Sequence, residues 1–243
     1  MNPPPTIPDF VPRELEQLGV TLAPDRLDTL ARYLARLLDA TQRVNLTAIR
    51  EPDAAWRRLI IDSLTLLPGF DPVPAGAAII DIGTGGGLPG IPLAIARPDL
   101  RVTLLEATGK KVRFLNDCIT ELHLANTQAI QARAEAVGQD AAHRQRYDVA
   151  VSRAVGPMPE VLEYSLPLVK VGGRVLVMKG PKVEQELAAA GDALNILGAG
   201  ELEVFEAYPP AFGQDLVIVS LLKDRATPKA YPRRPGVPHH EPL

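Results

Sequence analysis

The segment IIDIGTGGGLPGIPLAIA, residues 79–96, constrains the fold more than any other part of the chain. A hydrophobic run that contains Asp81 is followed by five glycines within eight positions, starting at Gly83. A tight turn between a strand and a helix needs one or two glycines, whereas Gly83, Gly85 and Gly87 together leave the backbone open to a bound molecule. We therefore expect a strand, a ligand-binding loop and a helix, in this order.

Short hydrophobic runs alternate with helical segments from residue 77 onward. Five of the runs have the near-continuous hydrophobicity of buried parallel strands: residues 77–82, 101–106, 127–132, 147–152 and 173–179. Residues 215–222 form a later run that faces the more polar run 201–208 across a turn with two prolines. The alternation predicts an α/β fold with a Rossmann-like, doubly wound sheet and a closing antiparallel hairpin. Ligands bind such sheets beyond the carboxyl ends of the strands, which is where the glycine-rich loop lies.

Three regions are expected along the 243 residues. Residues 1–70 form an N-terminal helical region, because the segment 24–46 repeats leucine and alanine with the period of an α-helix. Residues 71–225 hold the α/β domain, and the turn-rich segment 69–76 marks the boundary. Residues 226–243 contain five prolines and are expected to be extended rather than packed.

Composition and charge argue against several classes of protein. A net charge of −3 excludes a surface that is basic throughout, so any contact with RNA must come from a local patch. The apolar runs are too short to span a membrane and the first ten residues do not resemble a signal peptide, which favours a cytoplasmic protein. The one cysteine, Cys118, lies on the hydrophobic face of a predicted helix and is interpreted as a core thiol. The four histidines lack the spacing of a metal site.

Residues around the loop narrow the choice of ligand. A dinucleotide-binding loop reads G-x-G-x-x-G, but Leu88 stands where its third glycine belongs. Asp81 lies two residues before Gly83, and D-x-G-x-G-x-G is the pattern of class I S-adenosylmethionine methyltransferases. A carboxylate attracts the ammonium and sulfonium of that cofactor and would repel a pyrophosphate. Glu106 ends the next strand 19 residues after Gly87, where it can accept both ribose hydroxyls of either cofactor.

Eight segments resemble one bacterial family in order and spacing: NLTAIREP, DSL, DIGTGGGLPGIPLAI, LLEATGKKVRFL, RAE, SRAV, LPLVKVGGRVLVMKG and TPKAYPRRPGVP. They are similar to the small-subunit ribosomal RNA methyltransferase G family, also called glucose-inhibited division protein B. The resemblance implies a class I methyltransferase that transfers a methyl group from S-adenosylmethionine to N7 of guanine 527, in the 530 loop of 16S rRNA. It also implies cofactor contacts at Gly83, Leu88, Ala134, Glu135 and Arg153.

One position departs from the family pattern. The family commonly has a histidine in the motif R-H-x-x-D-S, whereas this chain reads RLIIDS, with Leu59 in place of the histidine. The role of that histidine is therefore absent or is taken by Arg57 or Arg58. We count both arginines among the candidate substrate contacts.

The segment after the fourth strand agrees with methylation of guanine N7. Methylation of an exocyclic amine usually uses a Pro-Pro-aromatic motif there, and methylation of a pyrimidine carbon needs a cysteine, whereas this chain reads SRAV, residues 152–155. N7 has a free lone pair and no proton, so the transfer needs alignment rather than a general base. Arg153 or Lys179 can orient the base through O6, although Lys179 is equally suited to capping the end of its strand.

The expected partner is 16S rRNA, naked or in the 30S subunit, bound by a monomer. Lys229, Arg233 and Arg234 in the tail are candidate phosphate contacts, and we favour a tail that is ordered against RNA or cofactor. Two other functions stay open: a class I methyltransferase of a small molecule or protein, and a non-catalytic RNA-binding module. The combination of Asp81, the glycine-rich loop and Glu106 speaks against the non-catalytic module.

Overall fold

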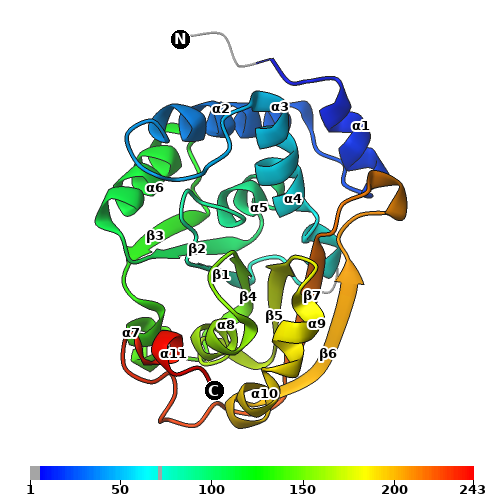
Figure 1. Ribbon diagram of the computed structural model, residues 1–243. Coiled ribbons are helices and arrows are strands. Elements are labelled where there is room, and N and C mark those ends of the chain that lie inside the picture. The colour runs from blue at the N-terminus through cyan, green and yellow to red at the C-terminus, as the bar shows by residue number, and fades with distance from the viewer. Residues whose placement is uncertain (1–5, 71–72) are drawn as a thin grey trace.

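The computed structural model describes residues 6–70 and 73–243 (Figure 1). The predicted boundary at residue 71 and the first five residues, part of the segment considered for a signal peptide, lie outside the described residues. The N-terminal region is helical. Its elements are α1 (Phe10–Gln17), α2 (Pro24–Ala40), α3 (Pro52–Ala55), the π-helix η1 (Trp56–Ile61), α4 (Asp62–Leu64) and the 3₁₀-helix η2 (Leu67–Phe70).

Seven strands form one sheet in the order β3-β2-β1-β4-β5-β7-β6. Strands β1 to β5 are parallel, and β7 runs antiparallel to both β5 and β6. The predicted doubly wound sheet with a closing antiparallel hairpin is confirmed, and each predicted run overlaps one strand. The strands are β1 (Ala78–Ile82), β2 (Arg101–Glu106), β3 (Thr127–Gln131), β4 (Tyr147–Arg153), β5 (Val169–Lys179), β6 (Ala199–Glu206) and β7 (Val217–Lys223).

Helices cover both faces of the sheet (Figure 1). One face shares a hydrophobic core with α5 (Gly90–Ala96), α6 (Gly109–Glu121) and the N-terminal helices. The other face packs against α7 (Ala134–Gln139), α8 (Met158–Ser165), α9 (Val183–Ala188) and α10 (Gly191–Leu197). Consecutive residues of β1 serve the two cores, Ile79 the first and Ile80 the second, because side chains alternate along a strand.

The parallel strands bring the predicted site residues to one edge of the sheet. In β1, Ile82 pairs with Leu105 of β2 and with Ser152 of β4. Each of these three residues is followed by a residue singled out in the sequence: Gly83, Glu106 and Arg153. The register therefore makes the glycine-rich loop, the end of β2 and the end of β4 neighbours.

Cys118 is fully buried in the first hydrophobic core, on α6. Burial raises the pKa of its thiol to about 11, so the thiolate is scarce at neutral pH. The interpretation as a core thiol is confirmed. Within residues 6–70 and 73–243 no helix combines the length and hydrophobicity that crossing a membrane requires.

The C-terminal tail is packed against the domain, contrary to the expectation from its prolines. The guanidinium of Arg144 donates to the carbonyl oxygens of Thr227 and Tyr231, at 2.8 and 2.7 Å. The side-chain amide of Gln139 donates to the carbonyl oxygen of Pro232 at 2.8 Å. Prolines remove backbone donors but leave carbonyl acceptors, and donors from outside the tail satisfy them here. The short helix α11 (Val237–His240) follows.

Candidate functional site

The glycine-rich loop turns directly after β1. The backbone nitrogens of Gly83 and Thr84 donate to the carbonyl oxygen of Leu105, at 2.9 and 3.1 Å, and tie the loop to β2. Gly83 and Gly85 have φ values of +66° and +59°, a conformation that side chains disfavour. A Cβ on Gly83 would lie 2.9 Å from Cγ2 of Val155, just beyond β4. The loop approaches the end of β4 this closely because Gly83 has no side chain.

Two further glycines of the loop serve packing. A Cβ on Gly86 would lie 2.6 Å from Cδ1 of Leu37 in α2, and one on Gly87 would lie 2.5 Å from Cδ1 of Ile91. The hydroxyl of Tyr33, also in α2, donates to the carbonyl oxygen of Gly86 at 2.8 Å. Gly87 is predicted to leave room for a cofactor, but its missing side chain is accounted for by the close approach of α2 and α5.

Asp81 is fully buried beneath the loop. Its Oδ2 accepts hydrogen bonds from Oγ1 of Thr84 at 2.5 Å and from the backbone nitrogen of Gly90 at 2.7 Å. Burial raises the pKa of Asp81 to about 7 because it outweighs these two hydrogen bonds. Oδ1 is buried and has no hydrogen-bond partner in the part of the chain that the structure describes. Asp81 therefore holds the loop, and its contact with a cationic ligand stays a prediction.

A cavity of about 250 Å³ lies beside the loop at the carboxyl edge of the sheet. Four residues predicted to bind the cofactor, from three separate connections, line it: Gly83, Glu106, Ala134 and Glu135. Five others do not line it: Asp81, Gly85, Gly87, Leu88 and Arg153. Val155, Glu160 and Tyr164 complete its wall on the side of β4 and α8.

Glu106 connects the cavity wall to the loop. Its Oε2 accepts the backbone N–H of Gly85 at 3.1 Å, and its Oε1 accepts that of Thr108 at 2.8 Å. The ammonium of Lys111 lies 3.9 Å from Oε2. Each carboxylate oxygen has two lone pairs, so Glu106 can accept hydroxyl groups of a ligand while it holds Gly85.

Arg153 ends β4 and lines neither this cavity nor a second one, but it lies beside Asp62, which lines the second. Its Nη2 lies 3.9 Å from Oδ2 of Asp62, and Oδ1 of Asp62 accepts the hydroxyl of Tyr208 at 2.5 Å. Nη1 is buried without a hydrogen-bond partner among residues 6–70 and 73–243. Burial lowers the pKa of Arg153 and raises that of Asp62, and the charge of each counteracts the shift of the other. A partly buried guanidinium with unused donors is suited to a polar ligand.

The second cavity, of about 380 Å³, lies between α1, η1 and the connection from β6 to β7, which contains the 3₁₀-helix η3 (Pro210–Phe212). The ring centroids of Tyr208 and Phe212 are 5.4 Å apart at its wall. Its full lining is Glu14, Gln17, Arg57, Arg58, Asp62, Tyr208, Ala211, Phe212 and Gln214. The cavity therefore combines aromatic surface with cations and a carboxylate.

The two arginines near the absent histidine differ in their contacts. Arg57 donates to Oε1 of Glu14 at 2.9 Å, and its guanidinium stacks on the ring of Phe10 at 3.6 Å from the centroid. Arg58 is exposed and has no ion-pair or hydrogen-bond partner in the described part of the chain. Leu59 is buried in the first core and lines neither cavity. Arg58 is thus the arginine of this pair that is free to contact a substrate.

Two other predicted substrate contacts are already paired within the chain. The ammonium of Lys179 donates to the carbonyl oxygen of Gly156 at 2.6 Å and to Glu186 at 2.5 Å, which favours the strand-capping alternative. Arg233 is paired with the buried Glu163 and so is not a free phosphate contact. Lys229 and Arg234 are exposed. The described residues contain no group of three or more His, Cys, Asp or Glu side chains that could hold a metal ion.

Comparisons with known proteins identify the family. The family model described as rRNA small subunit methyltransferase G matches residues 26–209. The chain belongs to this family. Curated relatives named ribosomal RNA small subunit methyltransferase G include that of Moorella thermoacetica, 42% identical over 93% of both chains. Another is that of Rubrobacter xylanophilus, 43% identical over 95% of this chain and 89% of the relative.

Solved structures confirm the class I methyltransferase fold. One is a Methanococcus maripaludis protein described as an S-adenosyl-L-methionine-dependent methyltransferase, with a TM-score of 0.55, 13% identity, and coverage of 79% of this chain and 92% of that one. Another is the Methanococcus jannaschii fibrillarin pre-rRNA processing protein, with a TM-score of 0.50, 17% identity, and coverage of 63% and 70%. As a member of the methyltransferase G family, the protein is an S-adenosylmethionine-dependent methyltransferase.

The first cavity is the candidate site for this cofactor. Its wall combines the side-chain-free surface of Gly83 with the carboxylates of Glu106 and Glu135, which match the hydroxyl and amino donors of an adenosine. The buried Nη1 of Arg153, which lacks a partner in the described structure, is suited to the carboxylate of the methionine part. The cofactor supplies an activated methyl group on its sulfonium.

Sequence reasoning missed several residues at the two cavities. Glu160 and Tyr164 lie on a helix whose pattern reads as ordinary core packing. Tyr208 lies two residues beyond the polar strand β6 and gives no signal of its own. Asp62 belongs to the DSL segment that supports the resemblance, so this acidic residue was the one detectable from sequence.

Proposed function

We propose that this protein transfers the methyl group of S-adenosylmethionine to N7 of a guanine in the 530 loop of 16S rRNA. The observation that carries the proposal is the partly buried guanidinium of Arg153 at the carboxyl end of β4. Its Nη1 is buried without a hydrogen-bond partner among the described residues, and its Nη2 lies 3.9 Å from Asp62, which lines a second cavity with aromatic walls. The family description, which names the small-subunit rRNA, supports the substrate class.

The second cavity is the proposed site of the target base. A base inside folded RNA must be unstacked before an enzyme can reach its ring atoms. Tyr208 and Phe212 offer ring surfaces for stacking, and the carboxylate of Asp62 can accept the N1–H and N2–H donors of guanine. Arg58, at the rim, is a candidate contact to O6 or to a neighbouring phosphate.

The chain's residues align the reactants and remove no proton. Guanine N7 offers a lone pair, so nucleophilic attack on the methyl carbon needs only an in-line approach. Arg153 holds its charge throughout the physiological range even though burial lowers its pKa, and it therefore cannot act as a base near neutral pH. Its proposed role is to fix the relative positions of the cofactor and the base.

Transfer of labelled methyl groups tests the substrate class. The purified enzyme and labelled S-adenosylmethionine are incubated separately with 30S subunits, naked 16S rRNA, ribosomal proteins and a small-molecule extract. The proposal predicts label in 16S rRNA in one or both of the first two incubations. Label in the extract or in protein alone would favour the alternative methyltransferase activity, and cofactor binding without any transfer would favour a non-catalytic module.

The proposal also concerns the state of the enzyme. All residues assigned to the two cavities come from one chain, so a monomer is sufficient. Because the proposed substrate is a bacterial ribosomal RNA, the enzyme works in the cytoplasm. Sedimentation of the enzyme with 30S subunits is expected to show one copy for each bound particle.

A further inference from the structure

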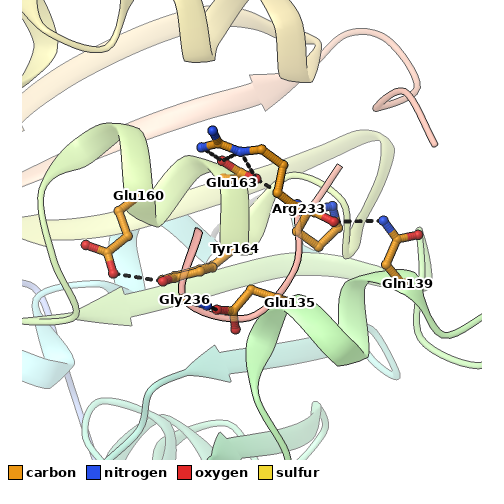
Figure 2. Close-up of polar contacts among 8 residues, drawn as sticks. Glu135, Gln139, Glu160, Glu163, Tyr164, Arg233 and Gly236 are labelled. Atoms are coloured by element: carbon orange, nitrogen blue, oxygen red, sulfur yellow. Dashed lines mark hydrogen bonds and ion pairs between the residues drawn. The ribbon is translucent and has the colours of Figure 1, made fainter. Parts of the chain in front are cut away.

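The C-terminal tail is bonded to α8, a helix that contributes to one wall of the first cavity. Arg233 donates from Nε and Nη2 to the carboxylate of Glu163 on α8, with shortest distances of 2.9 and 2.6 Å (Figure 2). The backbone nitrogen of Arg233 donates to the same carboxylate at 2.8 Å. Glu160, one helical turn earlier on α8, lines the cavity.

The anchor is strong because Glu163 is fully buried. A buried carboxylate is stable only when it is paired and hydrogen-bonded, and Arg233 supplies both the charge and three donors. Because one of these donors is a backbone N–H, the contact fixes the direction of the chain as well as the side chain. The residues that follow Arg233 therefore start from a fixed position and direction.

Three residues later, the tail reaches the opposite wall of the cavity. The backbone nitrogen of Gly236 donates to Oε1 of Glu135 at 2.9 Å, and Glu135 lies in the first turn of α7 (Figure 2). Gly236 has a φ of +88°, which turns the chain into α11. From α11, Nδ1 of His239 lies 3.3 Å from Oε2 of Glu160, whose Oε1 accepts the hydroxyl of Tyr164.

These contacts provide a hydrogen-bond donor to only one of the two carboxylate oxygens of Glu135. Its Oε1 is held by Gly236, whereas Oε2 has no hydrogen-bond partner within residues 6–70 and 73–243. Oε2 is not completely buried, and Glu135 lines the cavity. Since Glu135 is almost fully buried, a change in its orientation would reshape the cavity wall.

We propose that tail residues 233–240 position Glu135 for the adenosine end of S-adenosylmethionine. Adenosine presents amino and hydroxyl donors, which a carboxylate oxygen of fixed orientation can accept. Gly236 acts through Glu135 and is a positioning residue. The proposal rests on the assignment of the first cavity to the cofactor and is independent of which base is methylated.

Gly236→Ala in the full-length chain tests this role. Alanine disfavours a φ of +88°, and the added Cβ meets only Cδ2 of His240 at 3.8 Å, so the substitution shifts the turn without a clash. Gly76→Ala is the matched control, because Gly76 has a φ of +80° with no atom within 4 Å of an added Cβ and precedes the amino end of β1, whereas the cavity lies beyond the carboxyl end of that strand. Calorimetry measures the binding of S-adenosylmethionine and of 5′-methylthioadenosine, which lacks the amino-acid end.

We expect Gly236→Ala to weaken both ligands by about tenfold, the effect of impairing one hydrogen bond to a charged group, and Gly76→Ala to leave both unchanged. In a Glu135→Gln background, Gly236→Ala should then have less than about a twofold further effect, because coupled residues are not additive. Any one of three results would overturn the proposal. These are unchanged affinities with a lowered melting temperature, full additivity with Glu135→Gln, and a loss of affinity for S-adenosylmethionine alone. Failure of the wild-type protein to bind either ligand would instead overturn the cofactor assignment itself.

Discussion

Replacing Gly83 by alanine is expected to impair cofactor binding as well as folding. Gly83 has a φ of +66°, and its missing side chain leaves room for Val155 on the wall of the first cavity. The added Cβ would lie 2.9 Å from Cγ2 of Val155, closer than such atoms normally approach. Because Val155 is only partly buried and borders the cavity, it can move away from the new methyl group into the space assigned to the cofactor.

The two costs can be estimated separately. Holding alanine in the left-handed region costs about 1 to 2 kcal/mol of folding free energy. The displaced side chain and the new methyl group intrude on the space of the ligand. Overpacking of this kind costs about 1 to 3 kcal/mol, which here weakens the free energy of cofactor binding. A loss of 1.4 kcal/mol is tenfold in affinity, so we expect S-adenosylmethionine to bind about 10- to 100-fold more weakly.

Gly19→Ala provides the matched control for Gly83→Ala. Gly19 has a φ of +72° and no atom within 4 Å of an added Cβ, so it carries the backbone strain without the contact. Urea unfolding measures the stability of both variants, and calorimetry measures their binding of S-adenosylmethionine. Equal affinity of Gly83→Ala and Gly19→Ala for the cofactor would refute the assignment of this loop.

Three further substitutions test other parts of the site. Glu106→Ala should weaken the binding of S-adenosylmethionine and of S-adenosylhomocysteine equally, by about 1.5 to 3 kcal/mol, because both ligands contain the ribose. Weaker binding of only one of them in calorimetry would exclude a ribose contact. Burial raises the pKa of Asp81 from 3.8 to about 7, so its stabilising contribution is complete below pH 3.8 and is lost as the pH rises through 7. The wild-type protein should therefore lose stability relative to Asp81→Asn between about pH 4 and pH 7 in urea unfolding, and parallel pH profiles would contradict this. Arg153→Ala should slow single-turnover methylation at least about a hundredfold, and Arg153→Lys should recover part of the rate. The rate of the wild-type enzyme should be nearly independent of pH between about 6.5 and 9. A rise in that rate through a pKa near 7 that disappears in a histidine or glutamate variant would reveal a general base.

The sheet could be predicted from sequence because each strand carries its own local signal. Five continuous hydrophobic runs and the Gly83 to Gly90 cluster define parallel strands and the ligand loop without knowledge of distant contacts. The carboxyl-edge position of Glu106 then follows from strand order alone. Four of the predicted cofactor residues meet at one cavity for this reason.

The remaining features depend on contacts between elements that no local sequence pattern reveals. The tail packs because Gln139, Arg144 and Glu163 supply groups that match it, and no pattern within residues 226–243 reveals them. Lys179 is held by Glu186 from the next helix, a contact that strand periodicity cannot show. The missing side chain of Gly86 likewise serves the packing of Leu37 in α2, which the loop motif does not encode.

The central claim is that the enzyme methylates N7 of one guanine in the 530 loop of 16S rRNA. Its most direct test is mass spectrometry of 16S rRNA, isolated from 30S subunits or used naked, after one turnover with the purified enzyme and isotopically labelled S-adenosylmethionine. We expect a single labelled 7-methylguanosine, located in a nuclease fragment that contains the 530 loop. Label on another base, on an exocyclic amine or ring carbon, or in a fragment outside the 530 loop would contradict it.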